Sequence, residues 1–228
     1  MSEARIHFIG TVHSDPLGAK RLERALHYER PNAIAVECSP ELWGHISSGE
    51  WFEAEKRRLK KYKKLGLTNS AYKFILEELQ YQNFEPIVSL EYGKKQGVPT
   101  HLTDSPKVLY EFLSHHRSPP CGNVENMNRL NRNIRQQNAE TTYTDFNFST
   151  PDTLMYEHRI ANGQRNSFID RDDYAEKKIR EILADRIEKL VIVCGLAHCL
   201  HDRSRNSLFS RLQEYHPTRA TLKWYDDQ

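Results

Sequence analysis

Two short stretches of the sequence share a Gly-x-x-His motif that follows an apolar run. The first, IHFIGTVH, contains Gly10 and ends at His13; the second, LVIVCGLAH, contains Gly195 and ends at His198. Apolar runs of this length are typical of buried strands, so each imidazole should lie just beyond the carboxyl end of a strand. Glycine allows a close backbone approach there, and histidine supplies a metal ligand or a titratable nitrogen near neutral pH. We therefore predict that the fold brings His13 and His198 to one site.

Two carboxylates also follow predicted strands. Residues 33–38 (AIAVEC) are apolar until Glu37, and residues 98–104 (VPTHLTD) end in Asp104. A carboxylate that ends an otherwise apolar strand is costly to bury without a partner, which favours a metal ligand or general base at Glu37. Asp104 is suited to orient a histidine. In an open parallel sheet, ligands bind outside the carboxyl ends of the strands, so we expect these groups on one rim.

The elements that must position these residues alternate along the chain. Strands are predicted at 6–12, 33–38, 98–104 and 190–194, with an edge strand at 220–225. Helical patterns fill 41–83, 84–97, 166–187 and 205–215. This alternation predicts an α/β fold with a central, mostly parallel sheet flanked by helices. We expect one domain over 1–228, with a helical or lid-like insertion around 110–165.

Composition narrows the function classes. The chain has 228 residues, 38% of them hydrophobic, and a net charge of only +2, which gives no general argument for nucleic acid or membrane binding. The basic run at 55–64 (EKRRLKKYKK) is interpreted as a solvated helix face. The four cysteines show no CxxC spacing, and no signal peptide pattern precedes the first strand. These features predict a cytoplasmic protein without a membrane segment.

The ordered set of motifs resembles the TraB/PrgY/GumN family, which includes the Tiki proteins. The similar segments are FIGTVH ending at His13, PNAIAVE ending at Glu37, then Glu91, the strand that ends in Asp104, DRDDY at 170–174, and VCGLAH ending at His198. Together they span residues 6–200. The family belongs to a wider group with the erythromycin-esterase-like and ChaN-like proteins.

The resemblance implies an α/β fold of two related halves and a metal-dependent peptidase or other hydrolase activity on a peptide or small-molecule substrate. By analogy, His13, His198 and Glu37 hold a divalent cation (zinc, manganese, cobalt or iron), and Arg171 contacts the substrate or stabilises developing negative charge. The residues expected around these groups or around the substrate are Gly10, Glu91, Asp104, Asp170, Tyr174 and Gly195.

Three other functions stay open at this point. A metal-free, esterase-like hydrolase would use His13 as general base on water, oriented by Glu37. A protein of the ChaN type would bind haem through an exposed side chain. An interaction module would use the basic run 55–64. The sequence also leaves open the oligomeric state, including a homo-oligomer.

Overall fold

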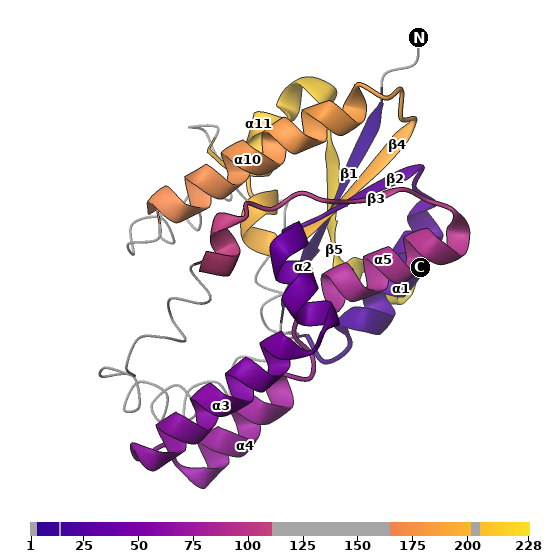
Figure 1. The fold of residues 1–228 in the computed structure, drawn as a ribbon. Helices are drawn as coiled ribbons and strands as arrows, with labels where there is room; N and C mark the ends of the chain where they lie inside the picture. Colours follow the sequence, from indigo (N-terminus) through magenta and orange to yellow (C-terminus); the bar gives the residue numbers. More distant parts are fainter. Residues whose placement is uncertain (1–3, 14, 111–164, 202–205) are drawn as a thin grey trace.

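The computed structural model describes residues 4–13, 15–110, 165–201 and 206–228, which form a sheet with helices on both faces (Figure 1). The five strands are β1 (Arg5–Thr11), β2 (Ala33–Val36), β3 (Thr100–Leu102), β4 (Lys189–Gly195) and β5 (Thr218–Thr221). They are all parallel, in the order β3-β2-β4-β1-β5. The predicted α/β class is confirmed. The insertion expected around 110–165 lies outside the described residues.

The two faces of the sheet are covered by different helices. One face packs against α1 (Gly18–Glu29), α5 (Phe84–Gln96) and the 3-10 helix η4 (Leu222–Asp227). The other packs against α10 (Arg165–Leu183) and α11 (Leu208–Arg211). The edge strand predicted at 220–225 lies earlier in the sequence, because β5 spans Thr218–Thr221. The 3-10 helix η4 follows it and contributes to the core.

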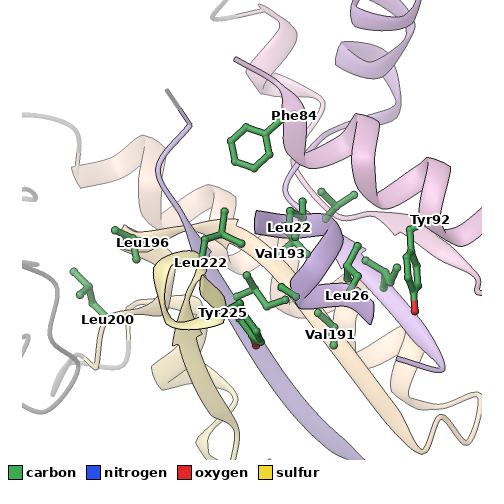
Figure 2. Packing of buried hydrophobic residues seen from close by; sticks show 14 residues of the cluster. Leu22, Leu26, Phe84, Tyr92, Val191, Val193, Leu196, Leu200, Leu222 and Tyr225 are labelled. Carbon is green, nitrogen blue, oxygen red and sulfur yellow. The ribbon is translucent and has the colours of Figure 1, made fainter. Parts of the chain in front are cut away.

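Side chains of the central strands alternate between two apolar clusters, as a strand covered on both faces requires. On β4, Val191 and Val193 join the cluster beneath α1 and α5, where Tyr225 of η4 is also fully buried (Figure 2). Leu190 and Ile192 point to the opposite cluster beneath α10. Sheet and helices are therefore held by apolar burial at about 25 cal/mol per Å² of surface removed from water.

The helical pattern at 41–83 divides into three helices, α2 (Pro40–Ser47), α3 (Glu50–Lys64) and α4 (Asn69–Glu78). Positive φ angles at Gly49 and Gly66 separate them, a conformation that glycine adopts without steric cost. The helices α3 and α4 share a small apolar cluster of their own and extend away from the sheet (Figure 1). Among the described helices, none combines the length and hydropathy that a membrane crossing requires.

Candidate functional site at the carboxyl end of the sheet

The sheet places the two Gly-x-x-His motifs side by side. β1 and β4 are neighbours, with Thr11 opposite Gly195. A Cβ atom at Gly195 would lie 2.9 Å from His13 Nε2, and one at Gly10 would lie 2.6 Å from Leu196 Cδ2. Each motif's glycine thus makes room for a side chain of the other motif. This mutual packing explains why both motifs contain a glycine at the same position.

Glu37 lies between the two histidines. One carboxylate oxygen, Oε1, contacts Arg171 Nη2 at 2.5 Å and His198 Nε2 at 3.1 Å, and the other accepts a hydrogen bond from the Gly195 N–H at 2.6 Å. Burial alone would raise the pKa of Glu37. The nearby His198 and Arg171 outweigh it and hold the pKa well below its usual range. Glu37 is therefore ionised at neutral pH.

Arg171 joins Glu37 to Asp104. Its Nε and Nη2 atoms donate to the two carboxylate oxygens of Asp104 at 3.0 and 2.6 Å, a bidentate pair. The Ser105 N–H also donates to Asp104 at 2.7 Å. The pKa of Arg171 is raised despite burial, because both carboxylates favour its charge. The helix α10 thus supplies the cation that neutralises the ends of β2 and β3.

His198 is fixed from the other side by Asp172. Its Nδ1 bonds Asp172 Oδ1, while Oδ2 of Asp172 accepts from the Leu208 N–H at 3.0 Å. The two side chains are only 5% and 1% exposed. Burial raises the pKa of Asp172. Burial also disfavours the charged form of His198 and alone would lower its pKa. Asp172 and Glu37 nevertheless raise the pKa of His198 well above its ordinary value.

His13 is held in the same manner, but at the surface. Its Nδ1 lies 2.6 Å from Glu85 Oε1, and that oxygen also accepts from Thr11 Oγ1 at 2.9 Å. Glu85 is buried in the first turn of α5, whereas the His13 side chain is 58% exposed. Partial desolvation disfavours the imidazolium, yet Glu85 raises the pKa of His13 to about 9. His13 is the side chain of the site that solvent reaches most easily.

A cleft of about 340 Å³ opens beside this pair. Its polar wall includes His13, Glu37, Glu85, Asp104 and Arg171, and its apolar wall includes Leu42 and Ile46 of α2. His198 does not line it and contacts instead a cavity of about 10 Å³, close to the size of one water molecule. The site therefore has an open side at His13 and a closed side at His198.

The remaining residues expected at the site lie elsewhere. Glu91 is exposed on α5, six residues after Glu85 and therefore about 240° around the helix axis. Asp170 is exposed and pairs with Lys107 at 3.2 Å. Tyr174 lines a groove between α10 and β3. The structure does not bring these three residues to the charged cluster.

Two carboxylates of the site were not anticipated, Glu85 and Asp172. A weak signal existed for each: Glu85 stands in a Phe-Glu-Pro helix start, and Asp172 follows Arg171 directly. Both orient an imidazole through Nδ1, and both are nearly inaccessible to solvent. Glu85 and Asp172 thus differ from Glu91 and Asp170 in being buried and paired with a histidine.

Among the described residues, no three His, Cys, Asp or Glu side chains are preassembled as a metal cage. The donor set itself is suited to a cation. Each histidine has Nδ1 held by a carboxylate, and the Nε2 atoms of both lie near Glu37. This carboxylate–histidine arrangement is usual around metal-binding imidazoles. In this conformation the Glu37 carboxylate already contacts three groups: Arg171, His198 and the Gly195 N–H.

No family model, curated protein or solved structure matches the chain. The resemblance to the TraB/PrgY/GumN family therefore stays a prediction.

Proposed function

We propose that the chain is a hydrolase that binds a peptide or other acyl substrate in the cleft, with a divalent cation held by His13, His198 and Glu37. The single observation that carries the proposal is the matched pair of carboxylate-oriented histidines on either side of Glu37. The cation would polarise a substrate carbonyl and lower the pKa of a water molecule. Zinc, manganese, cobalt and iron all suit two imidazoles and a carboxylate.

The protein's own residues have distinct roles in this proposal. Glu85 and Asp172 hold the imidazoles by Nδ1, which leaves both Nε2 atoms on the Glu37 side, where His198 Nε2 contacts Glu37 directly. Asp104 holds Arg171, and Arg171 in turn fixes Glu37. A positive guanidinium beside the cleft also offers a partner for a substrate carboxylate or for negative charge that develops during hydrolysis.

The first test is the metal content of the native protein and of the His13→Ala plus His198→Ala double variant, measured by elemental analysis. We expect bound metal in the native protein and its loss in the variant. Since His198 is buried, His13→Gln alone serves as a second variant whose folding is less affected. His45→Gln, on α2 and outside the cluster, is the control. Equal metal content in all four proteins would refute the two-histidine site.

A sharper test uses two glutamates of the same helix. Glu85→Gln removes the carboxylate that orients His13, and we expect metal affinity to fall about 10- to 100-fold. Glu91→Gln changes an exposed residue and should leave affinity unchanged. Isothermal titration with the metal found in the native protein measures both. Equal affinities in the two variants would remove Glu85 from the proposal.

The metal-free alternative has one observation in its favour. His13 is exposed at the cleft and forms a pair with Glu85, rather than with Glu37 as predicted. Its pKa of about 9 counts against the role of general base, because His13 would carry a proton at neutral pH and would first have to lose it. Any hydrolytic activity that survives a chelator and is lost in His13→Gln would favour this second candidate.

A further inference from the structure

The strand β3 stands at the edge of the sheet and has one side unpaired among the described residues. The hydrogen bonds from Ile34 N–H to the Pro99 carbonyl and from Thr103 N–H to the Val36 carbonyl fix its register on β2. Backbone groups alternate in direction along a strand, so those of Thr100 and Leu102 face away from β2. Such a row of outward N–H and C=O groups is a template for another strand.

A groove of about 540 Å³ runs along this edge, between β3 and α10. The α10 residues that line it recur every three or four positions, which places them on one face of the helix. They are Tyr174, Lys178, Glu181, Ile182 and Asp185. Opposite them lie β3 and Thr103. The groove therefore has a peptide backbone on one wall and a helix face on the other.

The groove leads to the candidate site. Arg171, which contacts Glu37, precedes Tyr174 by three residues on α10. Thr103, at the other wall, is followed directly by Asp104, which binds Arg171. Because both walls continue into the charged cluster, a chain that lies along β3 towards its carboxyl end would reach that cluster.

The charges of the groove are mixed. Lys178 and Glu181 form an ion pair at 2.8 Å, and Asp185 adds a negative charge at the end remote from the site. A polyanion such as nucleic acid needs a surface of predominantly positive charge. Mixed charge beside an open strand edge fits a peptide, whose backbone supplies the pairing groups.

We propose that an extended peptide segment binds along the β3 edge as an additional strand, in the groove between β3 and α10. Its backbone pairs with Thr100 and Leu102, and its side chains alternate between the groove and solvent. The proposal deepens the proposed hydrolase function and rests on it for the fate of the bound peptide. Binding itself requires only the edge and the groove, so the two can fail separately.

The test measures binding by fluorescence anisotropy with a labelled peptide of alternating threonine and valine that has a lysine at each end. A chelator is present, so that no metal-dependent cleavage competes. Two further peptides carry N-methyl groups on alternate residues, one set on each edge of the extended chain. We expect one N-methylated peptide to lose at least tenfold in affinity and the other to bind as the parent does. Equal affinities of the three peptides, or no binding of the parent, would overturn the proposal.

The matched protein variants are Leu102→Pro and Leu102→Ala. Both remove the leucine side chain, but only proline removes the outward N–H, which an edge strand tolerates. We expect Leu102→Pro to bind the parent peptide at least tenfold more weakly than Leu102→Ala, with thermal unfolding as the check on folding. Equal binding by the two variants would contradict pairing at Leu102.

Amide hydrogen exchange of the unmodified protein gives an independent readout. The Thr100 and Leu102 amides should exchange slowly only when the peptide is present, whereas Thr103 is already bonded to Val36. Unchanged exchange at Thr100 and Leu102, or protection that follows dimerisation of the protein instead of peptide addition, would overturn the proposal. Binding without cleavage in the metal-loaded protein would count against the hydrolase, and cleavage that ignores N-methylation would count against the docking edge.

Discussion

Histidines with polar partners lie at both ends of the sheet, but their pKa values are shifted in opposite directions. The amino-end cluster consists of His7, Glu29, Lys189, Thr218 and Tyr225. His7 bonds Thr218 Oγ1 and the Tyr225 hydroxyl, both at 2.7 Å, and Tyr225 donates to Glu29 at 2.8 Å. Burial lowers the pKa of His7, and Lys189 offsets part of the attraction of Glu29. His7 is therefore neutral at neutral pH and connects β1, β5 and η4.

The carboxyl-end cluster consists of His13, Glu37, Glu85, Asp104, Arg171, Asp172 and His198. Here four carboxylates face one guanidinium and two imidazoles, and the pKa values of both histidines are raised. The histidines at the two ends thus differ in charge. The carboxyl-end cluster has an excess of carboxylates, whereas at the amino end Glu29 is paired with Lys189. Carboxylates in excess, which keep nearby histidines charged beside an open cleft, indicate a functional site. A closed network with balanced charges indicates a structural role.

The largest expected effect is that of Asp172→Ala. The change leaves the buried His198 imidazole and the Leu208 N–H without the acceptor that now binds both. Removing one partner of a buried ion pair costs about 3 to 5 kcal/mol. Urea unfolding should show this loss in the free energy of unfolding.

The control for Asp172→Ala is its neighbour. Asp173→Ala removes a 55% exposed carboxylate that pairs with Arg211, and exposed pairs are worth at most about 1 kcal/mol. If the two variants were equally stable, the buried ion pair would not hold the carboxyl-end cluster together.

The second expected effect is a difference in pH dependence between the two ends. His7 has a lowered pKa in the folded protein, so stability falls as pH drops below the ordinary histidine value of 6.5. His13 has a raised pKa, so in the metal-free protein its contribution is complete below 6.5 and is lost as pH rises towards about 9. His7→Gln should flatten the acid side of the stability curve, and His13→Gln the alkaline side.

Unfolding free energies over a series of pH values, with a chelator present, measure both slopes. His27→Gln, whose ring packs against Tyr92 away from either cluster, is the control. A flattening on the same side in the His7 and His13 variants would remove the electrostatic distinction between the two ends.

The smallest expected change in stability is that of Gly195→Ala. Its φ of −58° is open to alanine, and the atom that a Cβ would meet is at the end of the half-exposed His13 side chain. We expect the free energy of unfolding to change by less than about 1 kcal/mol, while displacement of His13 abolishes metal retention. Thermal unfolding and elemental analysis measure the two effects.

Gly44→Ala is the matched control. Gly44 lies in α2, and a Cβ there would meet nothing within 4 Å. Alanine in a helix interior is favoured by about 0.5 to 1 kcal/mol, so this variant should be slightly more stable and retain its metal. Metal retention in Gly195→Ala equal to that in Gly44→Ala would contradict the close approach of the two motifs.

Periodicity predicted much of the fold. Apolar runs are recognisable in the sequence because a strand covered on both faces is apolar, and β1, β2 and β4 were placed by this pattern. The strand β3 was also predicted, although its half-buried residues do not form an apolar run. The helix breaks at Gly49 and Gly66 were missed, although Ser47 and Ser48 precede the first glycine and Thr68, the N-cap of α4, follows the second. The edge strand was placed two residues late, since a short strand and a 3-10 turn have similar local patterns.

The sequence by itself determined the strands and the polar groups that follow them: Glu37 directly after an apolar run, His13 and His198 three residues after the glycine that ends such a run, and Asp104 after β3. It could not determine which acidic residue of a helix reaches them. Glu85 and Glu91 lie on one helix, and only the packing of α5 against α1, β2 and β3 turns the first towards His13 and the second towards solvent. The direction in which a helix face points depends on the sheet beneath it, and that contact forms only when residues far apart in the sequence come together.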